Sequence, residues 1–188
     1  MAISADIVLA VSISKPLPPP PPHGNARIRI ANVDRKFLSR EFEVTWEGGV
    51  EIDATVHEWS NYFKAGMQGA LEFMRDNSIG PVADRGLVGM DVLVSGTVPA
   101  GAGLSSSAAF VCASALAVLV ANGVTEVKKA DLVGLAIVSE RYVGVNSGGY
   151  IIPPTPLSYY NSLLTRWDIY IAWIKVQVYT EWKAARFI

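Results

Sequence analysis

The sequence predicts a single α+β domain, and three observations support this. The chain has 188 residues, of which 51% are hydrophobic and 18% are charged, so it carries enough apolar side chains to bury a core. Short segments rich in β-branched residues predict strands. Longer segments with apolar residues at helical spacing predict helices, and both kinds occur within the first 149 residues.

Four segments are expected to be strands. Residues 5–14 are apolar and β-branched, and residues 26–31 alternate Ile28 and Ile30 with polar positions. We expect these two strands to pair with each other across the connection between them. Residues 41–46 and 89–95 predict two further strands.

Three segments are expected to be helices. Residues 58–77 place apolar side chains from Trp59 to Met74 at helical spacing. Residues 105–122 are rich in Ala and lie in a charge-free run, 108–124, that is shorter than a strongly apolar bilayer span of about twenty residues. We therefore interpret this run as a buried helix. Residues 129–143 predict the last helix, with Leu132, Leu135, Ala136 and Ser139 on one face.

Composition excludes several classes of function. The 16 basic and 17 acidic residues give a net charge of −1, so no basic surplus indicates a nucleic acid or an anionic membrane as a partner. Cys112 is the single cysteine and rules out an internal disulfide. Two histidines leave little material for a metal site built on imidazoles. With no signal sequence recognised, we expect a cytoplasmic protein.

Two segments depart from the rest of the composition. Residues 15–24, KPLPPPPPHG, favour polyproline II, and we interpret them as a surface loop, with a ligand for an SH3 or WW domain as the weaker alternative. All 16 glycines lie at or before Gly149, whereas residues 150–188 hold none and are rich in aromatics. We expect a domain over 1–149 and a divergent tail over 150–188 that shares little core with it. Residues 168–180 of the tail partly alternate, as a strand or an amphipathic segment would.

A glycine- and serine-rich loop, PAGAGLSSSAA at residues 99–109, carries the chemistry. Glycines let the backbone approach a ligand closely, and the first N–H groups of the following helix form an anion site at the positive end of its dipole. A serine hydroxyl there can also bind Mg²⁺. The alternative is a turn with a serine N-cap. The predicted phosphate-binding residues are Gly101, Ala102, Gly103, Leu104, Ser105, Ser106 and Ser107.

The same loop resembles the second motif of the GHMP kinases, P-x-G-x-G-L-S-S-S-A. Three other segments resemble galactokinases of the fungal type within that family: WSNYFKAGMQGAL at 59–71, SERYVGVNSGG at 139–149, and the opening residues with IANVDRKF at 30–37. The resemblance covers residues 1–149. It implies the fold of a GHMP kinase N-terminal domain, which is ribosomal protein S5 domain 2-like and α+β.

The resemblance also implies an activity and a set of residues. Such kinases transfer the γ-phosphoryl group of ATP, with Mg²⁺, to a sugar hydroxyl, which in galactokinases is the anomeric hydroxyl of galactose. Ser107 and Glu140 would be the magnesium ligands, although Glu140 could instead be an exposed helix acid. The cleft would also include Asn61, Tyr62, Asn146, Gly148 and Gly149. For Asn61 and Tyr62 the alternative is a helix whose aromatics pack the core.

The sequence departs from the family at four points. Ile151 stands where the family has an Asp that acts as the base on the sugar hydroxyl, and the first motif, the third motif and the second domain are not found. We therefore expect a truncated chain that is inactive as a galactokinase. Two alternatives remain: a non-catalytic relative that binds ATP and sugar, of the transcriptional co-inducer type, and a non-functional truncated product.

Overall fold

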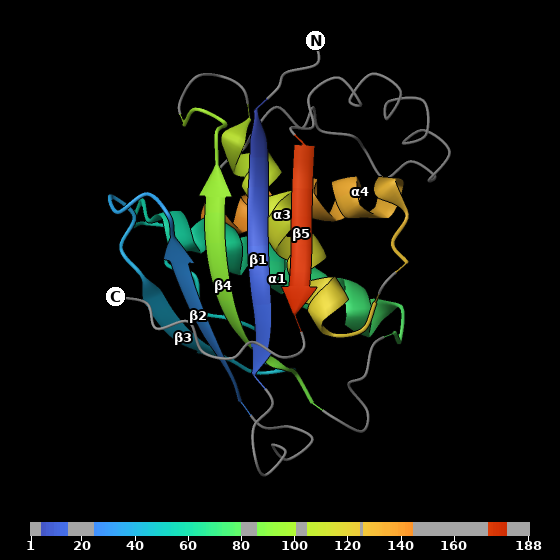
Figure 1. Ribbon diagram of the computed structural model, residues 1–188. Coiled ribbons are helices and arrows are strands. Elements are labelled where there is room, and N and C mark those ends of the chain that lie inside the picture. Colours follow the sequence, from blue (N-terminus) through green and yellow to red (C-terminus); the bar gives the residue numbers. More distant parts are fainter. Residues whose placement is uncertain are drawn as a thin grey trace.

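The protein forms two layers, a five-stranded sheet with its helices on one face (Figure 1). The structure is a computed structural model that describes residues 5–14, 25–79, 86–100, 105–124, 126–144 and 173–179. The predicted α+β fold is confirmed. The strands are β1 (Asp6–Ser14), β2 (Ala26–Asn32), β3 (Arg40–Val44), β4 (Gly89–Gly96) and β5 (Trp173–Tyr179), and the helices are α1 (Trp59–Asp76), α3 (Ser106–Ala121), α4 (Lys129–Ser139) and the 3₁₀ turn η1 (Glu140–Val143).

The strand order β3-β2-β4-β1-β5 corrects one expectation. β1 and β2 do not pair, because β4 lies between them, antiparallel to β1 and parallel to β2. A hairpin needs a connection of about 2–5 residues, and the proline-rich connection is much longer, so it does not force its two strands to be neighbours. β4 offers a better central strand because Met90, Val92 and Val94 are all buried.

The core lies between the sheet and the helices. The buried faces of β1 and β2 alternate strictly, with Leu9, Val11, Ile28 and Ile30 almost completely inaccessible. α3 lies at the centre and contacts α1, α4, β1 and β5, which is why it is apolar on nearly all sides. The interpretation of the run 108–124 as a buried helix is confirmed up to Ala121, where α3 ends.

Glycines bring α1 against its neighbours. A Cβ on Gly66 would lie 2.4 Å from the carbonyl oxygen of Val111, and a Cβ on Gly69 would lie 2.0 Å from Ser139 Oγ. No larger residue fits at these crossings without movement. α1 therefore packs closely against both α3 and α4 at these two glycines.

The last predicted helix differs slightly from the observed one. α4 ends at Ser139, and η1 continues as a tighter 3₁₀ turn to Val143. Gly144 follows in the left-handed conformation, with φ of 71°, and its N–H donates to the carbonyl oxygen of Arg141. This turn places the side chain of Tyr142 over Glu72 of α1, where its hydroxyl lies 2.6 and 2.7 Å from the two carboxylate oxygens.

One segment of the aromatic tail joins the sheet. β5 pairs in parallel with β1 over the register from Asp6 opposite Trp173 to Ser12 opposite Tyr179. The expected strand within 168–180 is confirmed over Trp173–Tyr179. The expectation that residues 150–188 share little core with residues 1–149 stays a prediction, because the pairing of β5 describes only the backbone of this segment. The remainder of 150–188 lies outside the described residues.

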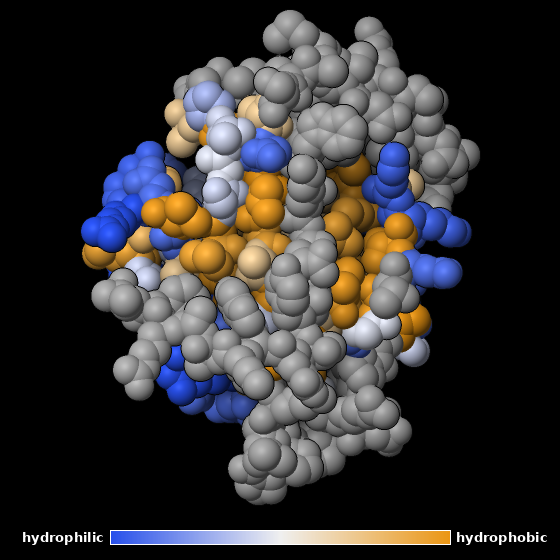
Figure 2. Space-filling view, in the orientation of Figure 1, coloured by the Kyte–Doolittle hydropathy of each residue, from blue (hydrophilic) through white to orange (hydrophobic). Residues whose placement is uncertain are grey.

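The outer face of the sheet is not covered by the described helices (Figure 2). Hydrophobic residues gather over the middle of β4 and β1, and hydrophilic residues lie toward β2 and β3. The charged side chains on this face pair with one another, Arg27 with Glu41 and Arg29 with Asp91. A hollow of about 290 Å³ beside Arg29 and Asp91 is lined partly by these paired charges.

Candidate functional site

A cavity of about 600 Å³ opens at one end of the sheet, where α1 and α3 begin. It is bounded by the start of β1, the ends of β2 and β4, and the first turns of the two helices. Its size suits a small molecule. The lining residues are Ile7, Asn32, Asp34, Lys36, Phe37, Trp59, Tyr62, Val94, Ser95, Gly96, Thr97, Val98, Pro99, Ala100, Ser106, Ser107 and Phe110.

Aromatic side chains form one wall of the cavity. The rings of Trp59 and Phe110 are stacked, with centroids 6.0 Å apart and an interplanar angle of 17°, and the ring of Phe37 lies 5.7 Å from that of Trp59. The indole Nε1 donates a hydrogen bond to the carbonyl oxygen of Leu38 at 3.0 Å, which fixes the orientation of the ring. A fixed apolar wall of this kind is suited to a flat ring of a ligand.

A charged rim adjoins the aromatic wall. Asp34 Oδ2 lies 2.8 Å from Lys36 Nζ, and Asp34 Oδ1 accepts a hydrogen bond from the backbone N–H of Lys36. The side-chain contact with Lys36, followed by that backbone bond, lowers the pKa of Asp34 below its ordinary value. The rim therefore presents an ionised carboxylate next to an ammonium group.

The opposite end of the cavity carries serine hydroxyls. Ser105 is the N-cap of α3 in the left-handed conformation, with φ of 54° and ψ of 44°, and its side chain makes no capping hydrogen bond. Ser106 and Ser107 occupy the first turn, where backbone N–H groups lack partners within the helix. The predicted serine helix start is thus confirmed, and it faces the cavity.

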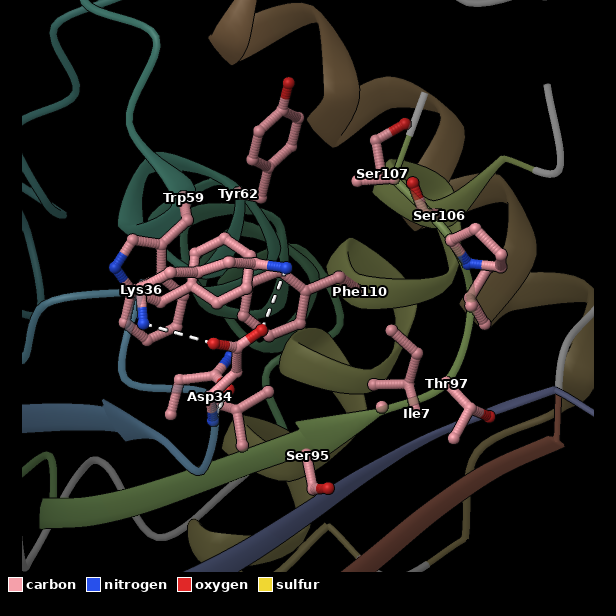
Figure 3. A pocket seen from close by; sticks show the side chains of 17 residues that line it. Ile7, Asp34, Lys36, Trp59, Tyr62, Ser95, Thr97, Ser106, Ser107 and Phe110 are labelled. Atoms are coloured by element: carbon pink, nitrogen blue, oxygen red, sulfur yellow. Dashed lines mark hydrogen bonds and ion pairs between the residues drawn. The ribbon is translucent and has the colours of Figure 1, made fainter. Parts of the chain in front are cut away.

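Figure 3 shows the two ends of the cavity together. Asp34, Lys36 and Trp59 lie on one side, Ser106 and Ser107 lie on the other, and Phe110 lies between. A ligand that fits this polarity has a flat ring at one end and an anionic group at the other, since the start of a helix attracts negative charge.

Glu140 is buried, with 2% of its surface exposed, so its interpretation as an exposed helix acid is wrong. It begins η1 and is not among the residues that line the cavity. Within the described part of the chain, no group of three His, Cys, Asp or Glu side chains could hold a metal. Mg²⁺ needs only one or two protein oxygens, because water and phosphate oxygens commonly supply its other ligands.

The other predicted residues divide into three groups. Tyr62 lines the cavity and also packs against the core. Asn61 is buried and does not line it, because its amide donates to the carbonyl oxygens of Asp53 and Val56 and so holds the loop before α1. Outside the described residues lie Gly101, Ala102, Gly103, Leu104, Asn146, Gly148, Gly149 and Ile151.

Sequence reasoning did not assign the aromatic wall and the charged rim to the site. Phe110 lies three residues after Ser107 on α3, a spacing that places both on one helix face, so this position could have been found. Asp34 and Lys36 lie in the segment 30–37 that resembles galactokinases, but their spacing does not place them in the site, since charged residues in a loop between strands are ordinarily solvated.

Comparison with known proteins identifies the family. The model of the GHMP kinases N terminal domain matches residues 61–154, which are 94 of the 188 residues. The chain belongs to the GHMP kinase family. The match covers α1 from Asn61 onward and all of β4, α3, α4 and η1.

The relatives of this GHMP kinase chain include galactokinases. It is 44% identical to the galactokinase of Candida parapsilosis over 149 residues and 41% identical to that of Saccharomyces cerevisiae over 152 residues. Each alignment covers 79% of this chain but only 27% and 28% of the respective relative. The chain thus spans little more than a quarter of the length of these relatives.

A solved structure supports the fold of the GHMP kinase domain. The mevalonate kinase of Methanococcus jannaschii matches with a TM-score of 0.51 and 14% identity, over 72% of this chain and 36% of that one. Across the described ranges, no helix has the length and apolarity needed to cross a membrane.

Proposed function

We propose that this chain is the nucleotide-binding part of an ATP-dependent sugar kinase of the galactokinase type. The observation that carries the proposal is the polarity of the cavity, with a stacked aromatic wall at one end and the start of α3 at the other. The adenine ring would lie against Trp59 and Phe110. The phosphates would lie at the N–H groups and hydroxyls of Ser106 and Ser107.

Mg²⁺ supplies charge neutralisation for the phosphates when it is bound. The protein residues proposed to hold it are Ser107 and Glu140. Ser107 is in the first turn of the helix proposed to receive the phosphates, and Glu140 is a buried residue at the start of η1, which follows α4. Residues 101–104 are proposed to complete the phosphate cradle.

Galactose is the proposed acceptor of the phosphoryl group. This assignment rests on the names of the relatives rather than on a described sugar site. A second function, nucleotide binding without phosphoryl transfer, is favoured by one observation: Ile151 stands at the position expected for the base and cannot accept a proton.

Isothermal titration calorimetry of the full chain with MgATP tests the nucleotide proposal. Binding should weaken when EDTA removes Mg²⁺ and in Ser107→Ala, but not in the control Ser12→Ala, which lies on β1 away from the cavity. Bound nucleotide should also raise stability by about 2.7 kcal/mol at a concentration of 100 Kd. Equal MgATP affinity in both serine variants would contradict the role of Ser107, and no heat and no stabilisation would contradict the function.

A further inference from the structure

The loop between β2 and β3, residues 33–39, lies at the end of the proposed nucleotide cleft where the adenine ring would bind. It supplies Asp34, Lys36 and Phe37 to the cavity. Its own hydrogen bonds make it compact: the N–H of Asp34 donates to Asn32 Oδ1 at 2.8 Å, and the N–H of Phe37 donates to the carbonyl oxygen of Asp34 at 3.1 Å.

The start of α1 holds the loop from outside the cavity. Glu58 is the N-cap of α1, yet its carboxylate makes no capping hydrogen bond and instead forms an ion pair with Arg40 Nε at the first residue of β3. N-cap positions usually favour short polar side chains that bond the helix backbone. The longer side chain of Glu58 therefore reaches from the start of α1 to the start of β3, where the loop of residues 33–39 ends.

We propose that Arg40 and Glu58 are positioning residues for the nucleotide cleft. Their ion pair fastens the end of the loop to α1, so that Asp34, Lys36 and Phe37 stand as a preformed wall before the ligand arrives. Neither Arg40 nor Glu58 lines the cavity, so both act only through the loop. The effect on affinity rests on the nucleotide-binding function proposed above.

The size of the effect follows from the exposure of the pair. The two side chains are 40% and 28% exposed, and ion pairs of this kind contribute little to global stability. Their effect should instead be local, since a loop that opens more often is competent to bind for a smaller fraction of the time. Trp59 also anchors the loop, through Leu38, but it touches the cavity itself and cannot separate positioning from direct contact.

The test uses Arg40→Gln, Glu58→Gln and the double variant in the full chain. The matched control is Arg27→Gln with Glu41→Gln, an exposed ion pair between β2 and β3 that does not line the cavity. Each site variant should raise the Kd for MgATP about 3- to 10-fold, and the double variant should be no worse than either single. The control should change Kd less than about twofold, and all variants should unfold at similar temperatures.

Hydrogen exchange of the unliganded chain gives a second measurement that needs no nucleotide. The amides of residues 33–39 should exchange about 3- to 10-fold faster in both site variants and should not change in the control. If Glu58→Gln speeds exchange and Arg40→Gln does not, Glu58 acts through the dipole of α1 and the proposed pairing is overturned. If the wild type binds MgATP, site variants whose Kd is unchanged would also overturn the pairing. Site variants in which the amides of residues 33–39 exchange at the wild-type rate would overturn it too. A wild type that fails to bind would overturn the proposed function instead, and exchange would still decide whether the pair holds the loop.

Discussion

Replacing Gly66 by Ala should destabilise the protein, although Ala is the better helix former. The added Cβ would lie 2.4 Å from the carbonyl oxygen of Val111, 2.8 Å from Ser114 Cβ and 3.0 Å from the N of Ala115. Ordinary contacts begin near 3.4 Å, so α1 and α3 would have to separate by about 1 Å. Overpacking against a rigid backbone costs up to about 3 kcal/mol, and the helix propensity of Ala returns about 1 kcal/mol. The net loss is about 2 kcal/mol, or about 4–8 °C in Tm.

Gly134→Ala is the matched control for Gly66→Ala. Gly134 lies within α4, and a Cβ there would meet no heavy atom within 4 Å. The same substitution should therefore stabilise the chain by up to about 1 kcal/mol. Thermal and urea unfolding, followed by circular dichroism, measure both variants. If Gly66→Ala were as stable as Gly134→Ala, the close crossing of α1 and α3 would be refuted.

Three further predictions concern single side chains. Burial raises the pKa of Cys112 to about 12, so a thiol reagent should modify the chain only at its rate of unfolding, and fast modification of the native state would contradict the buried position. Burial and the hydrogen bond to Glu72 raise the pKa of Tyr142 to about 12. The contribution of the Tyr142 hydroxyl to the free energy of unfolding should be complete below about pH 10, the pKa in the unfolded chain, and should be lost as pH rises toward 12. Tyr142→Phe should lower the free energy of unfolding in urea by about 1–2 kcal/mol at neutral pH. This variant should not lose further stability between pH 10 and 12 through this group. Galactose-dependent ADP release should be undetectable in the wild type and in Ile151→Asp, since a base is only one part of the site; turnover near one per second in either would contradict this.

Local patterns predicted the elements well because their causes are local. The alternation of Ile28 and Ile30 and the spacing from Trp59 to Met74 arise from the periods of a strand and a helix, and the observed bounds differ by only a few residues. The serine start of α3 was predictable for the same reason, since glycines and serines mark the beginning of a helix.

Strand pairing and the charged rim were not predictable because they depend on distant residues. β2 pairs with β4, which follows it by about sixty positions, and nothing near β2 encodes that choice. Asp34 and Lys36 belong to the cavity only because Trp59 and Glu58 bring α1 to the β2–β3 loop. Ile151, at the position where the family resemblance expects a base, lies outside the described residues and is known from sequence alone.

Photoaffinity labelling with 8-azido-ATP tests most directly whether the nucleotide occupies the cavity as proposed. The azido group reports the position of the base, so MgATP-protected labelling should fall on peptides that carry Phe37 or Tyr62, next to the stacked pair of Trp59 and Phe110. The label should be reduced when EDTA removes Mg²⁺. Labelling that MgATP does not prevent, or protected labelling confined to the hollow beside Arg29 and Asp91, would contradict the account.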